Sequence, residues 1–104
     1  MEQPNILFIL ADDLGWGDLS MHGSPIRTPN IDRLAREGMR FTDAHSPSTV
    51  CTPTQYSLLT GRMAFRNGMK GVFTGAGGPC LIKEDRLTIA GMLRDQGYTT
   101  AMFG

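Results

Sequence analysis

The stretch Asn5-Ile-Leu-Phe-Ile-Leu-Ala11, followed at once by Asp12-Asp13, decides the fold class of this 104-residue chain. An unbroken apolar run of this length is typical of a strand covered on both faces, as the strands of parallel sheets are. Asp12, Asp13 and Gly15 mark the end of that strand. In open α/β sheets, ligands bind at the edge formed by the carboxyl ends of the strands. The sequence therefore predicts a buried strand that ends at a ligand-binding edge.

The rest of the chain alternates between helical and extended patterns. Helices are predicted over 29–37, 53–60 and 87–96. Thr28-Pro29 marks the start of the first, and a glycine directly follows each of the three. Strands are predicted over 40–45 and 98–103, while residues 66–80, with five glycines and no periodicity, read as a loop. This order predicts an α/β fold with a partial parallel (mixed) sheet flanked by helices.

Composition excludes several classes of protein. The chain has ten basic and ten acidic residues and is 40% hydrophobic, so it reads as a globular protein without the basic surplus of a nucleic-acid partner. No apolar run approaches the ~18 residues of a membrane span, so no membrane partner is expected. This chain shows no secretory signal pattern, and its compartment stays open.

Two adjacent carboxylates form the first chemical signal. Asp12 and Asp13 repel one another unless water, cations or a metal compensate their charge. Carboxylate oxygens suit hard cations such as Ca²⁺ or Mg²⁺ rather than zinc. A solvated Asp-Asp turn is the other reading, and the pair alone does not exclude it.

Cys51 is the second signal. It directly precedes Thr52-Pro53, and therefore lies at or just before a helix N-terminus. Free N–H groups and the helix dipole there stabilise an anion, whether a reactive thiolate or a bound sulfate or phosphate. The alternative is a small residue that fills a gap. Cys51 and Cys80 fit no zinc spacing, and two free thiols are favoured over one disulfide.

Three motifs together carry a family resemblance. Asp12-Asp13-Leu-Gly-Trp-Gly-Asp18, Thr28-Pro-Asn-Ile-Asp32 and Cys51-Thr-Pro53 with Leu59-Thr-Gly-Arg62 stand in the order and spacing that sulfatases show. The chain thus resembles the sulfatases, members of the alkaline-phosphatase-like superfamily, from Asn5 to Gly104. The resemblance implies a large α/β N-terminal domain and a smaller C-terminal one. Residues 1–104 would then be an incomplete N-terminal part of the catalytic domain, with the remainder and the C-terminal domain absent.

The resemblance also implies a chemistry, that of an arylsulfatase-like sulfuric ester hydrolase. A formylglycine-generating enzyme would oxidise Cys51 to formylglycine, whose hydrated aldehyde attacks the sulfate ester substrate. Asp12 and Asp13 would bind Ca²⁺, or Mg²⁺ in its place, and residue 51 would contact the same ion. Arg62 would brace the helix that carries Cys51. Further site residues, including a Lys and a His, would lie beyond Gly104 in the remainder of the catalytic domain.

One residue departs from the family pattern. The motif Cys-x-Pro-x-Arg has Gln55 in place of its Arg, and glutamine brings neither a charge nor a rigid fork of donors. The alternatives are therefore a phosphate or phosphonate ester hydrolase, with Cys51 or a nearby Thr as nucleophile, and an inactive pseudo-sulfatase. His22 and His45 have no metal-ligand spacing and are predicted to be surface or hydrogen-bonded residues. Trp16 is predicted to pack the loop after the first strand.

Overall fold

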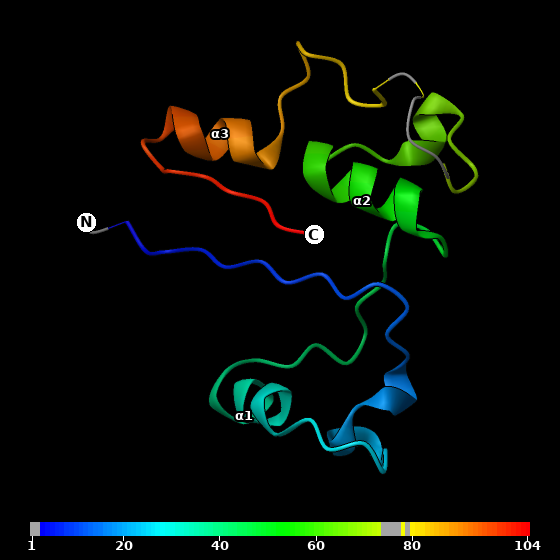
Figure 1. The fold of residues 1–104 in the computed structure, drawn as a ribbon, viewed down its shortest axis with the longest axis vertical. Coiled ribbons are helices and arrows are strands. Elements are labelled where there is room, and N and C mark those ends of the chain that lie inside the picture. Colours follow the sequence, from blue (N-terminus) through cyan, green and yellow to red (C-terminus); the bar gives the residue numbers. More distant parts are fainter. Residues whose placement is uncertain (1–2, 74–77, 79) are drawn as a thin grey trace. The chain divides into compact units, whose positions relative to one another are not determined.

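The computed structural model describes residues 3–73, 78 and 80–104, which form two compact units. The first unit, Met1–Ala44, contains the 3₁₀ helices η1 (Trp16–Asp18) and η2 (Ser20–His22) and the helix α1 (Pro29–Glu37). The second, His45–Gly104, contains α2 (Cys51–Thr60), η3 (Ala64–Asn67) and α3 (Ile89–Asp95) (Figure 1). None of the helices in the described part of the chain has the length and apolar character needed to cross a bilayer.

All three predicted helices are present. α1 has the predicted bounds, whereas α2 begins at Cys51 rather than Pro53. α3 begins at Ile89 because Thr88 is its N-cap, with its hydroxyl accepting the Gly91 N–H at 3.1 Å. Gly97 ends α3 with a φ of 87°, a left-handed conformation that favours glycine. The glycine-rich loop predicted over 66–80 contains the last residues of η3, and its residues 74–77 and 79 lie outside the described part.

The three predicted strands are not observed within residues 3–73, 78 and 80–104. A strand requires a neighbouring strand for its ladder of backbone hydrogen bonds, and residues 5–11, 40–45 and 98–103 form no such ladder with any segment that the structure describes. The first segment is not buried either, since Leu7 is 85% exposed and Ile9 is 74% exposed. The prediction of a covered sheet is therefore not confirmed.

A small buried cluster holds η3 against α2 in the second unit. The hydroxyl of Ser57 donates to the Pro53 carbonyl oxygen at 2.8 Å and accepts the Ala64 N–H at 3.0 Å. The Asn67 amide donates to the hydroxyl oxygen of the buried Tyr56. α2 also packs against α3. The helix that begins at Cys51 is thus fixed along its length by neighbours of its own unit.

Hydroxyl groups and one carboxylate connect η2 to α1 in the first unit. Asp32 accepts hydrogen bonds from the Ser20 hydroxyl at 2.6 Å and from the Thr28 hydroxyl at 3.1 Å. The backbone N–H of Ser20 donates to the Thr28 hydroxyl, and that of Thr28 to the Ser20 hydroxyl, both at 3.0 Å. The bond from Ser20 is the main cause that lowers the pKa of Asp32, and partial desolvation opposes it. The ionised carboxylate is therefore the form that this cluster stabilises.

This cluster predicts a pH-dependent contribution to stability. Because the folded-state pKa of Asp32 is lowered, its contribution is present above the unfolded value of about 3.9 and is lost as the pH falls through the folded value. Asp32→Asn should therefore lower the melting temperature of the full-length protein at pH 6, and the deficit should shrink below about pH 4. The control is Glu37→Gln on the same helix. It removes only an exposed ion pair, in which Glu37 Oε2 lies 3.9 Å from Arg33 Nε. An equal loss for both variants at pH 6 would contradict the prediction.

Candidate active site

Asp12 and Asp13 lie at the end of the extended N-terminal segment, and both are exposed. Asp13 has a φ of 59°, and it is the only described residue other than glycine with a positive φ. Aspartate tolerates this left-handed conformation better than most residues. Neither carboxylate has a hydrogen bond or ion pair with another described residue. The two negative charges are therefore uncompensated within the first unit.

Asp12 and Asp13 are the type of ligand that a divalent cation prefers, but two carboxylates are too few to complete its coordination. Two adjacent carboxylates are the hard oxygen donors that Ca²⁺ and Mg²⁺ prefer. A calcium ion takes 6–8 oxygen ligands, and no group of three or more His, Cys, Asp or Glu residues gathers among the described residues. Asp12 and Asp13 would therefore supply only part of a coordination shell.

The loop after the carboxylates is held by local contacts. The Gly15 N–H donates to the Asp18 carboxylate at 2.7 Å, which fixes the start of η1. His22 Nδ1 lies 2.8 Å from the Trp16 carbonyl oxygen, and the two rings stack with centroids 3.7 Å apart. The predictions that His22 is hydrogen-bonded and that Trp16 packs within this loop are confirmed. Neither ring contributes to a metal cluster in the described chain.

Cys51 is the first residue of α2, and its side chain is half-buried. Val50 precedes it in an extended conformation and has no side-chain acceptor to cap the helix. Pro53 has no N–H, so the open donors of the first turn are the backbone N–H groups of Cys51 and Thr52. Two N–H groups at a helix start, next to a thiol, can bind one anionic group.

Hydroxyl groups fix the chain as it enters α2. The Thr54 hydroxyl lies 2.9 Å from the carbonyl oxygens of both Ser48 and Val50, and it is the donor to both, because a carbonyl oxygen can only accept. The Ser46 hydroxyl donates to the same Ser48 carbonyl at 2.7 Å, and the Val50 N–H donates to the Ser48 hydroxyl at 3.3 Å. These bonds hold the peptide before Cys51 in one conformation. They also engage the carbonyl oxygens nearest to the helix start, whose negative ends would repel an anion.

Both cysteines are free, as predicted. The exposed Cys80 thiol donates to the Ile82 carbonyl oxygen at 2.9 Å. The Cys51 thiol has no hydrogen-bond partner among the described residues. Of the two cysteines, Cys51 is therefore the one with an uncommitted thiol at a helix start.

Gln55 and Arg62 lie on and just after α2. The Gln55 side chain is exposed, and Arg62 is half-buried beyond the left-handed Gly61 that ends the helix. The Arg62 backbone N–H donates to the Thr60 hydroxyl at 3.3 Å. Its guanidinium makes no ion pair or hydrogen bond within the described chain, so the bracing role predicted for it stays a prediction.

One residue near Cys51 has no sequence signal. The Phe73 N–H donates to the Thr52 hydroxyl at 3.1 Å, across 21 positions of the chain. Phe73 belongs to the glycine-rich stretch predicted as a loop, where no periodicity singles out a residue. The bond brings this stretch to the helix turn that contains Cys51. The two carboxylates belong to the other unit, so the structure brings Asp12 together with Asp13, and Cys51 together with Thr52 and Phe73.

Comparison with known proteins confirms the family resemblance. The family model described as Sulfatase matches residues 4–104. The chain is 48% identical to Arylsulfatase G of Mus musculus and 49% identical to Arylsulfatase A of Bos taurus, with 98% and 97% of this chain aligned. It is 44% identical to the human Steryl-sulfatase over 98% of its length. It spans 19%, 20% and 18% of these relatives, about a fifth of each. Because the family model covers nearly all of it, the chain belongs to the sulfatase family.

Proposed function

We propose that residues 1–104 are the N-terminal part of the catalytic domain of a sulfuric ester hydrolase of the arylsulfatase type. The remainder of that domain and the C-terminal domain lie outside these residues. Family membership and relatives named as arylsulfatases support the proposal. The observation that carries it is the start of α2, where Cys51 has an uncommitted thiol beside two open backbone donors.

The start of α2 is suited to bind the sulfate group of an ester. The N–H groups of Cys51 and Thr52 would donate to sulfate oxygens, and the positive end of the helix dipole would favour the charge that develops there. Cys51, as formylglycine, would supply the nucleophilic oxygen after hydration of its aldehyde. The oxidation requires a formylglycine-generating enzyme as a partner. Thr54 and Ser48 would keep this turn in place while the substrate binds.

Asp12 and Asp13 would hold a divalent cation. Ca²⁺ is the preferred ion because the carboxylates sit on an irregular, exposed segment, and Ca²⁺ accepts less regular geometry than Mg²⁺. Such an ion would supply a positive charge to the sulfate oxygens and to residue 51. Its further ligands would come from the remainder of the catalytic domain. Arg62 would brace α2 from its C-terminal end.

The structure bears on which nucleophile the phosphate-ester alternative would use. The predicted nucleophile of this alternative is Cys51 or a nearby threonine. The Thr54 hydroxyl donates to backbone carbonyl oxygens. The Thr52 hydroxyl accepts the Phe73 N–H, which ties its oxygen to another segment. Both threonines are thus engaged, and Cys51 is the nucleophile that we propose.

The nucleophile can be tested by mass spectrometry of the peptide 41–62 from full-length protein. We expect residue 51 to carry formylglycine when a formylglycine-generating enzyme is co-expressed, and Cys51→Ala to lower kcat by roughly 10³-fold or more. Thr54→Ser is the control, since it keeps both the cysteine and the hydroxyl. Hydrolysis of an aryl phosphate orders of magnitude faster than of the matched aryl sulfate would refute the sulfatase assignment.

The metal site can be tested by calcium titration of the full-length protein. Asp13→Asn should weaken Ca²⁺ binding, measured by calorimetry, by at least about tenfold, because it removes one charged ligand. Asp18→Asn is the matched control, because the Asp18 carboxylate is already bonded to the Gly15 N–H. Equal Ca²⁺ affinity in the wild type and in Asp13→Asn would remove Asp13 from the site.

Gln55 favours one second candidate, a pseudo-sulfatase that binds but does not hydrolyse sulfate esters. The exposed glutamine offers no charge where the family motif has Arg. If this residue limits the oxidation of Cys51, then Gln55→Arg should raise the formylglycine fraction at residue 51, measured by the same mass spectrometry. Gln55→Lys should raise it less, because an ammonium group lacks the planar fork of donors. Turnover of a sulfate ester by the wild type would exclude the inactive protein.

A further inference from the structure

A segment of the second unit runs back along α2 toward the start of that helix. It covers residues 64–73, which we call the strap, and it begins with η3. Three hydrogen bonds join the strap to α2, between Ala64 and Ser57, Asn67 and Tyr56, and Phe73 and Thr52. Because the residue numbers of the bonded pairs rise along the strap and fall along the helix, the strap ends beside the turn that contains Cys51.

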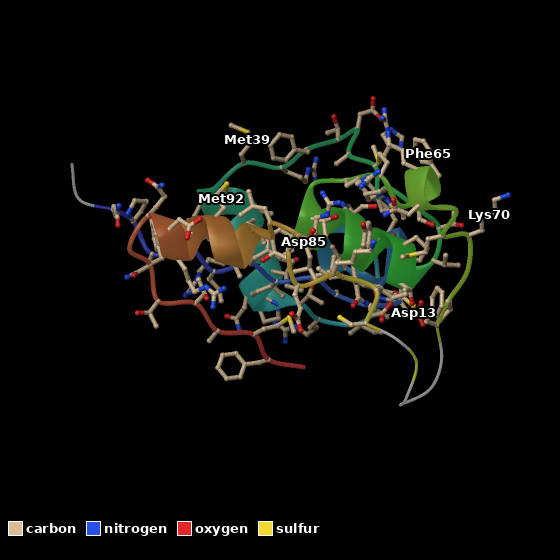
Figure 2. The ribbon with its side chains drawn as sticks, turned by 90° about the horizontal axis from the view of Figure 1, so that it is seen from above. Asp13, Met39, Phe65, Lys70, Asp85 and Met92 are labelled. Carbon is tan, nitrogen blue, oxygen red and sulfur yellow. The ribbon has the colours of Figure 1, made fainter. Side chains whose placement is uncertain are left out.

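The strap bonds to α2 chiefly through its backbone. Two of the three donors are backbone N–H groups, those of Ala64 and Phe73, whereas Asn67 uses its side chain. Other side chains of the strap extend elsewhere, since Phe65 is 66% exposed and Figure 2 shows Lys70 projecting away from the ribbon. The side chains that make these contacts therefore belong mainly to α2, and a substitution on the helix removes one bond at a time.

Two of the hydroxyl groups on α2 act on its first turn. Ser57, which is only 6% exposed, donates to the Pro53 carbonyl oxygen at 2.8 Å while its oxygen accepts from the strap. The Thr52 hydroxyl accepts the Phe73 N–H at 3.1 Å, and the N–H of Thr52 itself is one of the two open donors. The Pro53 ring restricts rotation about its N–Cα bond, so an anchored Pro53 also limits the movement of Thr52 before it. Both anchors therefore act on the residues that directly follow Cys51.

We propose that Ser57 and Thr52 are positioning residues, which hold the first turn of α2 on the strap so that its open N–H groups keep one direction when a sulfate group binds. This inference rests on the proposed function, because it needs the sulfate group to bind at this helix start. Donors that are already in place stabilise developing charge without reorganisation. Because they act most strongly in the transition state, loosening the turn lowers kcat more than it raises KM.

Steady-state kinetics of the full-length, formylglycine-containing protein test the role of Ser57. With 4-nitrophenyl sulfate, Ser57→Ala should lower kcat roughly tenfold and change KM by less than about threefold, since displaced donors matter most in the transition state. Ser57→Thr keeps the hydroxyl and should recover most of the lost kcat. Rates are divided by the formylglycine content and measured well below the melting temperature of each variant. Neither oxidation of Cys51 nor unfolding then enters the comparison.

The chain offers a matched control in Tyr56→Phe. Tyr56 is as buried as Ser57, and its hydroxyl also joins α2 to η3, but it bonds to Asn67 and to no group of the first turn in the described chain. Tyr56→Phe should therefore lower the melting temperature and leave kcat within about twofold of the wild type. Equal losses of kcat in Ser57→Ala and Tyr56→Phe would reduce Ser57 to a structural role and overturn the inference. A loss in Ser57→Ala that is confined to KM would overturn it as well.

Thr52 gives a second test at a site that is only half-buried, and it decides the matter where Ser57→Ala does not fold. Thr52→Val removes the acceptor for the Phe73 N–H and should lower kcat roughly three- to tenfold, whereas Thr52→Ser keeps the acceptor and should restore the wild-type value. Equal kcat in these two variants would overturn the anchor at Thr52. A wild type that hydrolyses no sulfate ester would instead overturn the proposed function, so the two failures are distinct.

Discussion

A helix begins with backbone N–H groups that its own turns cannot partner, and the start of α2 leaves two of them open. Val50 supplies no capping oxygen and Pro53 supplies no N–H, so the open donors belong to Cys51 and Thr52. A serine or aspartate at position 50 would cap these donors and compete with a bound anion. The Thr54 hydroxyl instead engages the nearby carbonyl oxygens. The sulfate-binding role proposed for the start of α2 depends on this separation of donors from acceptors.

Binding at such a start is effective only if the helix does not move when the anion arrives, since catalysis gains most from donors that are already in place. The buried Ser57 supplies that rigidity. Its hydroxyl joins the Pro53 carbonyl oxygen to the Ala64 N–H, so the first turn of α2 is tied to η3. A nonpolar residue at position 57 would leave the Ala64 N–H buried without a partner. The first turn of α2 is thus fixed to η3 through one buried hydroxyl group.

The helices could be predicted from sequence because their signals, capping residues and apolar spacing, are local. The pairing of strands could not be predicted, because it depends on segments that are distant in the chain. The sequence predicts Pro53 as the first residue of its helix, whereas it is the third residue of α2, where its missing N–H is equally harmless. The segment 5–11 has the pattern of a buried strand, but a strand forms only against a neighbour, and none pairs with it among the described residues. Membership of the sulfatase family implies an alkaline-phosphatase-like α/β fold, so the pattern agrees with the fold class that the family has.

The residues of the candidate site also fall into those that the sequence indicates and those that only the structure reveals. The Asp12-Asp13 pair and Cys51 were visible in the sequence because each is marked by its neighbours in the chain. Phe73 was not visible, because a backbone N–H and a threonine hydroxyl 21 positions apart leave no pattern of residue types. Residues that stand next to one another in the chain can be recognised as a motif, whereas a contact between a helix and a distant loop cannot. It follows that Cys51 and the Asp12-Asp13 pair can be proposed as site residues from the sequence, whereas the contact between Thr52 and Phe73 emerges only from the tertiary structure.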